Sequence, residues 1–285
     1  MRPASNEREW NKSWISQSPM FAPLAGVASR LPATAWPDVG ALNALCDELS
    51  GRVVNSNGDV ICFVPQTGKP ISFEEGFEPR AFLKGEVMVR PENWHDLFNA
   101  LVWMTFPRTK AVINARHYSL MQGQSYRQRS PAGDALTLFD EDGVVVLSSS
   151  KQLLELLREF QWKELFRAHR HAVKTEMRFL LFGHAMYEKA LNPFVGMTAK
   201  SILLHVPDVM LKRQGAAVND AVDLRLADYV ADASHLTHGK SLSPLPVLGV
   251  PGWWRQNETA SFYDDVSYFR PGRGGGDSSE SSSIS

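Results

Sequence analysis

Polar side chains of the kinds used in acid–base catalysis stand on both sides of Pro107. Some lie off the apolar stripe of the segment before Pro107, and others recur at i, i+4 and i+7 after it, so two polar ladders are expected to lie close together. Converging imidazole, carboxylate, amide and ammonium groups suit general acid–base chemistry or the stabilisation of a transition-state anion. Alternatively, these groups satisfy helix ends and backbone atoms. The residues are His95, Asp96, Asn99, Lys110, Asn114 and His117.

His184 and Glu188 form a second candidate, one helical turn apart and after an expected turn from strand to helix. The positive end of a helix dipole favours a neutral imidazole, which can act as a base or a ligand. His-x-x-x-Glu lacks the second histidine of the zinc-protease signature H-E-x-x-H. An ordinary i, i+4 helix pair is the alternative interpretation.

A basic and aromatic stretch over residues 97–133 forms the third candidate, because it contains no acidic residue. Such an excess of positive charge can bind a phosphate group or a nucleic-acid backbone. Acidic residues elsewhere in the fold could equally face these cations. The candidate anion-binding residues are Arg108, Arg116, Arg127 and Arg129.

Carboxylates at Asp134, Asp140 and Glu141 could bind Mg²⁺ through oxygen atoms. A turn at 140–142 accounts for the same acids, because Asp is common in turns, and we favour this second interpretation. The pair His169 and His171 is expected at a solvated helix end. No residue is assigned to a metal, and no cofactor is predicted.

The elements that must position these residues follow from hydrophobic periodicity and turn signals. Asp142-Gly143 between two β-rich runs predicts a β-hairpin over residues 136–147. The remaining strands are expected at 61–64, 85–90 and 177–182, the last of which could also be helical. Helices are expected from 38 to about 50 and at 92–106, 109–117, 149–160, 162–171, 184–191 and 218–233.

Composition predicts a single globular α+β domain at residues 37–270, with several amphipathic helices around the hairpin. Of the 285 residues 44% are hydrophobic, and the net charge is −1, so no global field attracts nucleic acid or an anionic membrane. Residues 1–36 are expected as an extended arm packed on the body through Trp10, Trp14 and Phe21. The Gly/Ser-rich residues 271–285 are expected to be disordered.

Cellular location is predicted from the absence of certain sequence signals. There is no signal peptide and no apolar run long enough to cross a bilayer, so we expect a soluble cytoplasmic protein without membrane partners. Cys46 and Cys62 match no zinc pattern and are expected to be reduced thiols.

Several segments, taken in order, resemble a bacterial family of unknown function, domain-of-unknown-function family 3025. They are WHDLFNALVW (94–103), FPRTKAVINARH (106–117), DALTLFDE (134–141), FGH (182–184) with Glu188-Lys189, and PLPVLGVPGWW (244–254). The resemblance covers most of residues 20–271. It implies no activity, cofactor or catalytic residue.

Two functional hypotheses follow from the sequence. The first is an enzyme, a hydrolase or phosphoryl-handling catalyst, which acts on a small-molecule or phosphorylated ligand. Its polar cleft would use His95, Asp96, Lys110, Asn114, His117 and His184. The second is a non-catalytic protein that binds nucleic acid or a phosphorylated partner through residues 97–133. The oligomeric state is not predicted.

Overall fold

A computed structural model of the chain describes residues 10–49, 53–68, 70–122 and 130–272. Its larger sheet has the strand order β4-β3-β5-β6. Strand β3 (Gly143–Ser148) pairs antiparallel with β4 (Met177–Leu181) and parallel with β5 (Thr198–His205), while β6 (Ser243–Pro246) pairs antiparallel with β5. All of β3 is buried, as expected for a run of β-branched residues at the centre of a sheet.

A smaller parallel sheet joins β1 (Cys62–Pro65) to β2 (Glu86–Val89). Helix α3 (Phe77–Lys84) forms the connection between them, and α2 (Val39–Asp47) packs against β1. The side chain of Asp38 caps α2, as the sequence predicts.

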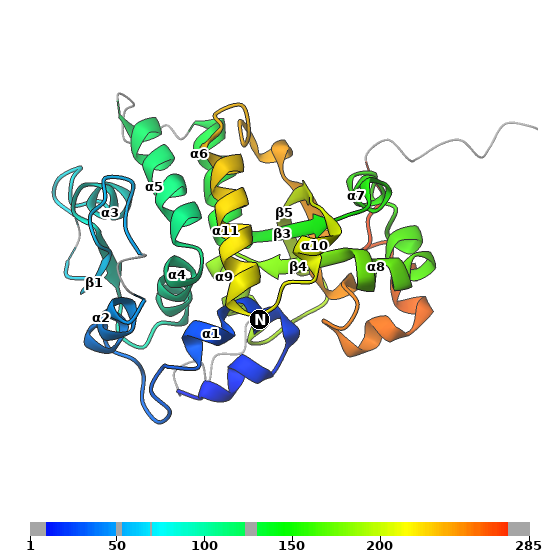
Figure 1. Cartoon of the computed structure of the whole chain (residues 1–285), viewed down its shortest axis with the longest axis horizontal. Coiled ribbons are helices and arrows are strands. Elements are labelled where there is room, and N and C mark those ends of the chain that lie inside the picture. The colour runs from blue at the N-terminus through cyan, green and yellow to red at the C-terminus, as the bar shows by residue number, and fades with distance from the viewer. Residues whose placement is uncertain (1–9, 50–52, 69, 123–129, 273–285) are drawn as a thin grey trace, which may run out of the picture.

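A group of helices lies between the two sheets (Figure 1). Helix α4 (Trp94–Thr105) packs on α9 (His184–Ala190), and α5 (Pro107–Met121) packs on α11 (Ala216–Ala231) and α6 (Pro131–Asp142). Every residue of α4 from Asp96 onward is buried, so this helix forms part of the core. Pro107 occupies the first turn of α5, where its missing N–H costs nothing.

The periphery consists of short helices. On one side of the larger sheet lie α7 (Lys151–Arg158), a π-helical turn (Glu164–Ala168), α8 (Arg170–Glu176) and α10 (Asp208–Leu211). Near the N-terminus, 3₁₀ helices Lys12–Ser16 and Pro19–Leu24 precede α1 (Ala25–Ala28), so this segment is helical rather than extended. Further 3₁₀ helices near the C-terminus span Gly239–Ser241, Val247–Gly249, Arg255–Glu258 and Ala260–Asp264.

The predicted hairpin over 136–147 is wrong, because its first half is the end of α6 and its second half is β3. Ser130 caps the helix with Pro131 in its first turn, and the buried Ala135, Leu136 and Phe139 follow a helical spacing. Gly143 has a φ of −72° and makes no type I′ turn. A Cβ at Gly143 would lie 2.2 Å from the carbonyl oxygen of Phe139, so close packing explains this glycine.

The other predicted elements agree with the structure more closely. Residues 177–181 of the predicted segment 177–182 form strand β4 rather than a helix, and α9 follows at His184. The helix predicted at 109–117 begins at Pro107 and continues to Met121. Strands β5 and β6 and helix α3 were not predicted. The chain is a single α+β domain.

Three further expectations concern the chain ends and membranes. Trp14 and Phe21 are buried in the core, with 1% and 0% of their surface exposed, and Trp10 is partly buried against it. The predicted tail lies outside the described residues from position 273 onward. Across the described ranges, no helix combines the length and the apolar character needed to cross a membrane.

Candidate functional site

His184 begins helix α9 directly after strand β4. Pairing of β4 with β3 places Gly183 against the chain at 141–143, where its N–H donates to the carbonyl of Gly143. A Cβ at Gly183 would lie 2.3 Å from the carbonyl oxygen of Glu141. The close backbone approach therefore holds His184 next to the last turn of α6.

Asp140, Glu141 and Asp142 form that last turn of α6. The C-terminal end of a helix carries partial negative charge, so three carboxylates there are unfavourable unless cations face them. Lys110 Nζ lies 2.6 and 2.8 Å from the two oxygens of Asp140, and Lys189 Nζ lies 2.5 Å from Asp142 Oδ1. Lysine ammonium groups therefore compensate the negative charges of Asp140 and Asp142, whereas the carboxylate of Glu141 faces histidine side chains.

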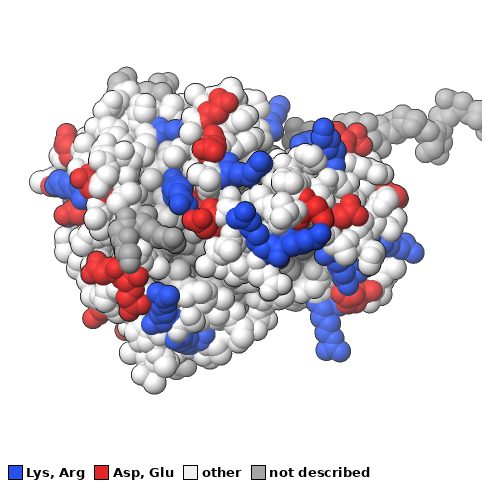
Figure 2. Space-filling model, in the orientation of Figure 1, with Lys and Arg blue, Asp and Glu red and all other residues white. Residues whose placement is uncertain are grey.

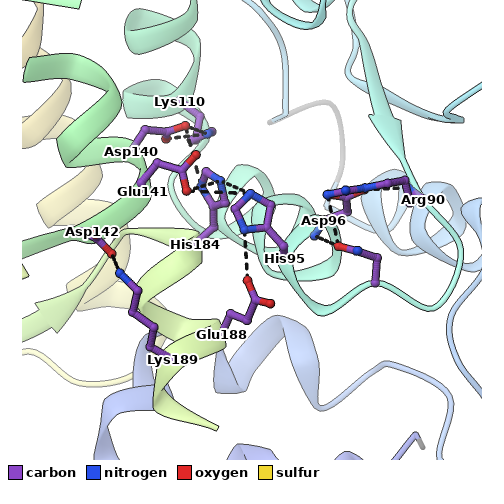
Figure 3. Close-up of polar contacts among 11 residues, drawn as sticks. Arg90, His95, Asp96, Lys110, Asp140, Glu141, Asp142, His184, Glu188 and Lys189 are labelled. Carbon is purple, nitrogen blue, oxygen red and sulfur yellow. Dashed lines mark hydrogen bonds and ion pairs between the residues drawn. The ribbon is translucent and has the colours of Figure 1, made fainter. Parts of the chain in front are cut away.

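His95 lies in the first turn of α4, whose start is fixed by hydrogen bonds. Asn93 caps the helix by accepting from the backbone N–H of Asp96. The Asp96 carboxylate accepts from the Arg90 backbone and, at 2.7 and 2.8 Å, from its guanidinium. Asp96 therefore positions the helix, and His95 projects from the helix toward α9 (Figure 3).

The imidazoles of His95 and His184 and the carboxylate of Glu141 converge at one point (Figure 3). The two Nε2 atoms are 3.1 Å apart. Glu141 Oε2 lies 3.5 Å from His184 Nε2 and 3.8 Å from His95 Nε2. Three elements, α4, α6 and α9, thus each contribute one donor to the polar centre, defined as His95, Glu141 and His184.

Each imidazole also faces a second carboxylate through its other nitrogen. His95 Nδ1 lies 3.2 Å from Glu188 Oε2, and His184 Nδ1 lies 3.8 Å from Asp140 Oδ2. The hydrogen bond to Glu188 raises the pKa of His95, against the opposing effect of burial. A carboxylate hydrogen-bonded to Nδ1 orients a histidine so that Nε2 can bind a metal, and Glu188 is such a partner for His95. Asp140 lies beyond hydrogen-bond distance of His184 Nδ1 and contributes only its charge.

Neighbouring positive charges keep the carboxylates of the centre ionised. Burial alone would raise the pKa of Asp140, but Lys110 and His184 outweigh it, and the pKa is lowered. For Glu141, burial is likewise outweighed by His184 and His95, and its pKa is lowered. An ionised Glu141 is the form that can bind a cation.

The donor spacing fits one metal ion. Bond lengths of about 2.0–2.2 Å in tetrahedral geometry separate neighbouring ligand atoms by about 3.3–3.6 Å. The three measured separations of 3.1, 3.5 and 3.8 Å bracket this range. Two imidazoles and one carboxylate suit a first-row transition metal such as zinc or ferrous iron.

The centre is buried on one side and accessible on the other. The side chain of His184 is 7% exposed, while those of His95 and Glu141 are 30% and 37% exposed. His184 Nδ1 is buried and has no hydrogen-bond partner among the described residues, since Asp140 lies just beyond hydrogen-bond distance. Buried polar atoms without partners are uncommon in proteins and occur at functional sites.

The structure separates the residues predicted around Pro107. Lys110 reaches the centre through Asp140, and His117 is close enough for its charge to lower the pKa of Asp140. Asn114 instead donates to the backbone carbonyl and carboxylate of Glu78 on α3. Asn114, and Asp96 at the start of α4, are therefore engaged in structural contacts away from the centre.

Two of the four predicted anion-binding arginines have protein partners. Arg108 pairs with Asp220 at 2.9 Å and with Asp223 at 3.4 Å, and Arg116 donates to the carbonyls of Val230 and His235. Arg127 and Arg129 lie outside the described residues. On the face shown in Figure 2, basic and acidic side chains are interspersed.

The sequence favours other roles for three residues near the polar centre. It favours a turn over a Mg²⁺ site for Asp140 and Glu141, and it offers Glu188 as a helical neighbour of His184. Asp134 lies in the first turn of α6, at the opposite end from Glu141, and does not join them. Gly183 brings His184 close to Glu141, because it packs against the backbone of residues 141–143. That packing depends on strand pairing, which the sequence does not reveal.

The chain was compared with curated proteins, solved structures and protein-family models. Neither the curated proteins nor the solved structures include a match to this chain. The model of a family described as protein of unknown function (DUF3025) matches residues 61–273, which include all three donors of the polar centre. The chain belongs to this family, DUF3025.

Proposed function

We propose that this protein is a metal-dependent hydrolase whose metal ion is bound by His95, Glu141 and His184. The observation that carries the proposal is the convergence of two Nε2 atoms and one carboxylate oxygen, 3.1 to 3.8 Å apart, with a carboxylate behind each imidazole. Structural zinc sites usually have four protein ligands, whereas catalytic sites have three and bind water in the fourth position. The described donor set has three.

This ligand arrangement supports hydrolysis for two reasons. A metal with two imidazole ligands and one carboxylate ligand lowers the pKa of bound water toward 7 and polarises a carbonyl or phosphoryl oxygen. The exposed sides of His95 and Glu141 leave a route by which substrate could reach that water. The hypothesis of a binding protein has less support, because Arg108 and Arg116 already have protein partners.

The first test is metal content. The purified chain, dialysed against metal-free buffer and reloaded with Zn²⁺ or Co²⁺, should retain about one equivalent, as one three-donor site requires. His184→Ala and Glu141→Gln should each lose most of it. His171→Ala, at an exposed histidine of α8, is the matched control and should bind like the wild type.

The second test is activity. A panel of chromogenic esters, amides and phosphate esters should show hydrolysis that dipicolinate abolishes and added metal restores. A wild-type protein that binds no more metal than His184→Ala would refute the proposal. If the protein retained iron and consumed dioxygen, the proposed reaction would be oxidation instead of hydrolysis, because ferrous iron uses the same donors.

A further inference from the structure

The charges around the polar centre indicate which substrates it can accept. Its neighbourhood contains four carboxylates, from Asp140, Glu141, Asp142 and Glu188, and two ammonium groups, from Lys110 and Lys189 (Figure 3). Four negative and two positive charges sum to −2 with neutral imidazoles. A divalent metal therefore brings these groups to neutrality and leaves no positive excess for an anionic substrate.

Both lysines already have a carboxylate partner. Lys110 is 3% exposed and is held by both oxygens of Asp140 at 2.6 and 2.8 Å. Lys189 is held by Asp142 at 2.5 Å. Phosphoryl groups are commonly bound by arginine or lysine side chains or by metal ions that face the phosphoryl oxygens.

The cation that follows strand β2, Arg90, also has a carboxylate partner. Arg90, whose pKa feels the charge of Glu188, makes its hydrogen bonds to Asp96 through the backbone N–H, Nε and Nη2. Glu188 itself is 47% exposed and adds negative charge on the accessible side of the centre. Among the described residues around the centre, the potential is thus unfavourable for a dianionic phosphate and tolerant of a neutral group.

We propose that the substrates of this centre are uncharged acyl compounds, esters or amides, and not phosphate esters. This inference rests on the proposed hydrolase function. In the reaction, the oxygen of water forms a bond to the carbonyl carbon, and the bond from that carbon to the alkoxy oxygen or amide nitrogen breaks. The leaving group takes its bonding electrons and one proton from the water, giving a carboxylic acid and an alcohol or amine.

The test compares matched substrates on the Co²⁺-loaded chain. Hydrolysis of 4-nitrophenyl acetate and of 4-nitrophenyl phosphate is measured, and each rate is divided by the rate with the same concentration of free Co²⁺, which removes the intrinsic reactivity of the ester. The enhancement should be at least about tenfold greater for the acetate, as expected when electrostatics oppose one substrate. An equal or greater enhancement for the phosphate would overturn the substrate class.

A binding measurement isolates the contribution of charge. Inorganic phosphate at about 1 mM should leave the visible Co²⁺ spectrum of the wild type unchanged. Asp142→Asn removes one negative charge and leaves Lys189 without that carboxylate, so phosphate should bind about tenfold more tightly in this variant. Asp264→Asn breaks an exposed pair with Lys163 and is the control, expected to match the wild type.

The outcomes separate the two proposals. If the chain gives no protein-bound Co²⁺ spectrum, both the hydrolase proposal and the proposed substrate class are refuted. If the wild type gives a protein-bound spectrum that changes with phosphate below about 1 mM, only the proposed substrate class is refuted.

Discussion

His95 and Asn114 are both polar residues on consecutive helices, but their surroundings give them different roles. The amide of Asn114 is buried and holds the backbone of α3 through Glu78. His95 is partly exposed, and its partners are the side chains of Glu188 and His184. Both residues were predictable as polar positions off an apolar stripe, whereas their partners, which come from distant segments, were not.

Replacement of these two residues should therefore have different effects on stability. Asn114→Ala leaves a buried carbonyl and a carboxylate without their donor and should lower the free energy of unfolding by about 1–3 kcal/mol. His95→Ala leaves groups that water can reach and should cost less than about 1 kcal/mol in the metal-free protein. Urea unfolding in the presence of EDTA measures both. Equal losses in the two variants would assign His95 a structural role.

The positions of the helices and strands, and the contacts between them, could be predicted only in part. The helix start at Asp38, a helix that begins near Ser149 or Ser150, the strand at β4 and the start of α9 are local signals, and the sequence indicates them correctly. The error at 136–147 arose because Asp-Gly is typical of hairpins, while the helical spacing of the apolar residues before it indicates α6. Placing Glu141 requires both that helix and the pairing of β3 with β4.

The ion pair between α5 and α6 should be sensitive to loss of one partner. Lys110→Met leaves the carboxylate of Asp140 buried and without its cation, and should cost about 3–5 kcal/mol. The double variant Lys110→Met/Asp140→Leu replaces both charges and should recover most of that loss. Lys212→Met breaks an exposed pair with Asp208 and should leave the unfolding midpoint unchanged. If Lys110→Met behaved like Lys212→Met, the pair would not be buried as described.

The turn between β4 and α9 should not tolerate a side chain. Gly183 has an ordinary φ of −62°, so the effect of Gly183→Ala would be steric only, through contact with the carbonyl of Glu141. The variant should lose about 1–3 kcal/mol of stability and bind Co²⁺ more weakly, because His184 and Glu141 would move apart. Gly26→Ala, with nothing within 4 Å of the added carbon, is the control. Wild-type metal affinity in Gly183→Ala would show that the turn does not set the donor spacing.

At the scale of the whole molecule, one core includes segments from both ends of the described chain. Trp14 and Phe21 near the start are buried, as are Tyr268 and Phe269 near the end. The sequence predicts the globular α+β domain, and it also predicts that a Gly/Ser-rich tail begins near Pro271. It does not predict β5 or β6. For β6 the reason is that prolines at 244 and 246 disfavour a strand, yet both lie in β6 at the edge of the sheet.

Residues 273–285 should be dispensable for folding. They are rich in Gly and Ser and cannot bury enough apolar surface to offset the entropy of ordering. Their deletion should leave the melting temperature within experimental error. A longer deletion, from Tyr268 onward, removes a hydroxyl that bonds Leu248 and Met197 and should lower it by several degrees. A comparable drop for the shorter deletion would show that these last residues stabilise the body.

The order of the three donors along the chain has a consequence for biosynthesis. His95 and His184 are 89 positions apart, with Glu141 between them, and each belongs to a different helix. A nascent chain therefore exposes the first histidine and the glutamate long before the second histidine leaves the ribosome. Only after α9 has docked against α4 do all three donors meet. Metal acquisition would thus follow synthesis of the domain, and a truncated translation product that ends before residue 184 would carry no competing site of this kind.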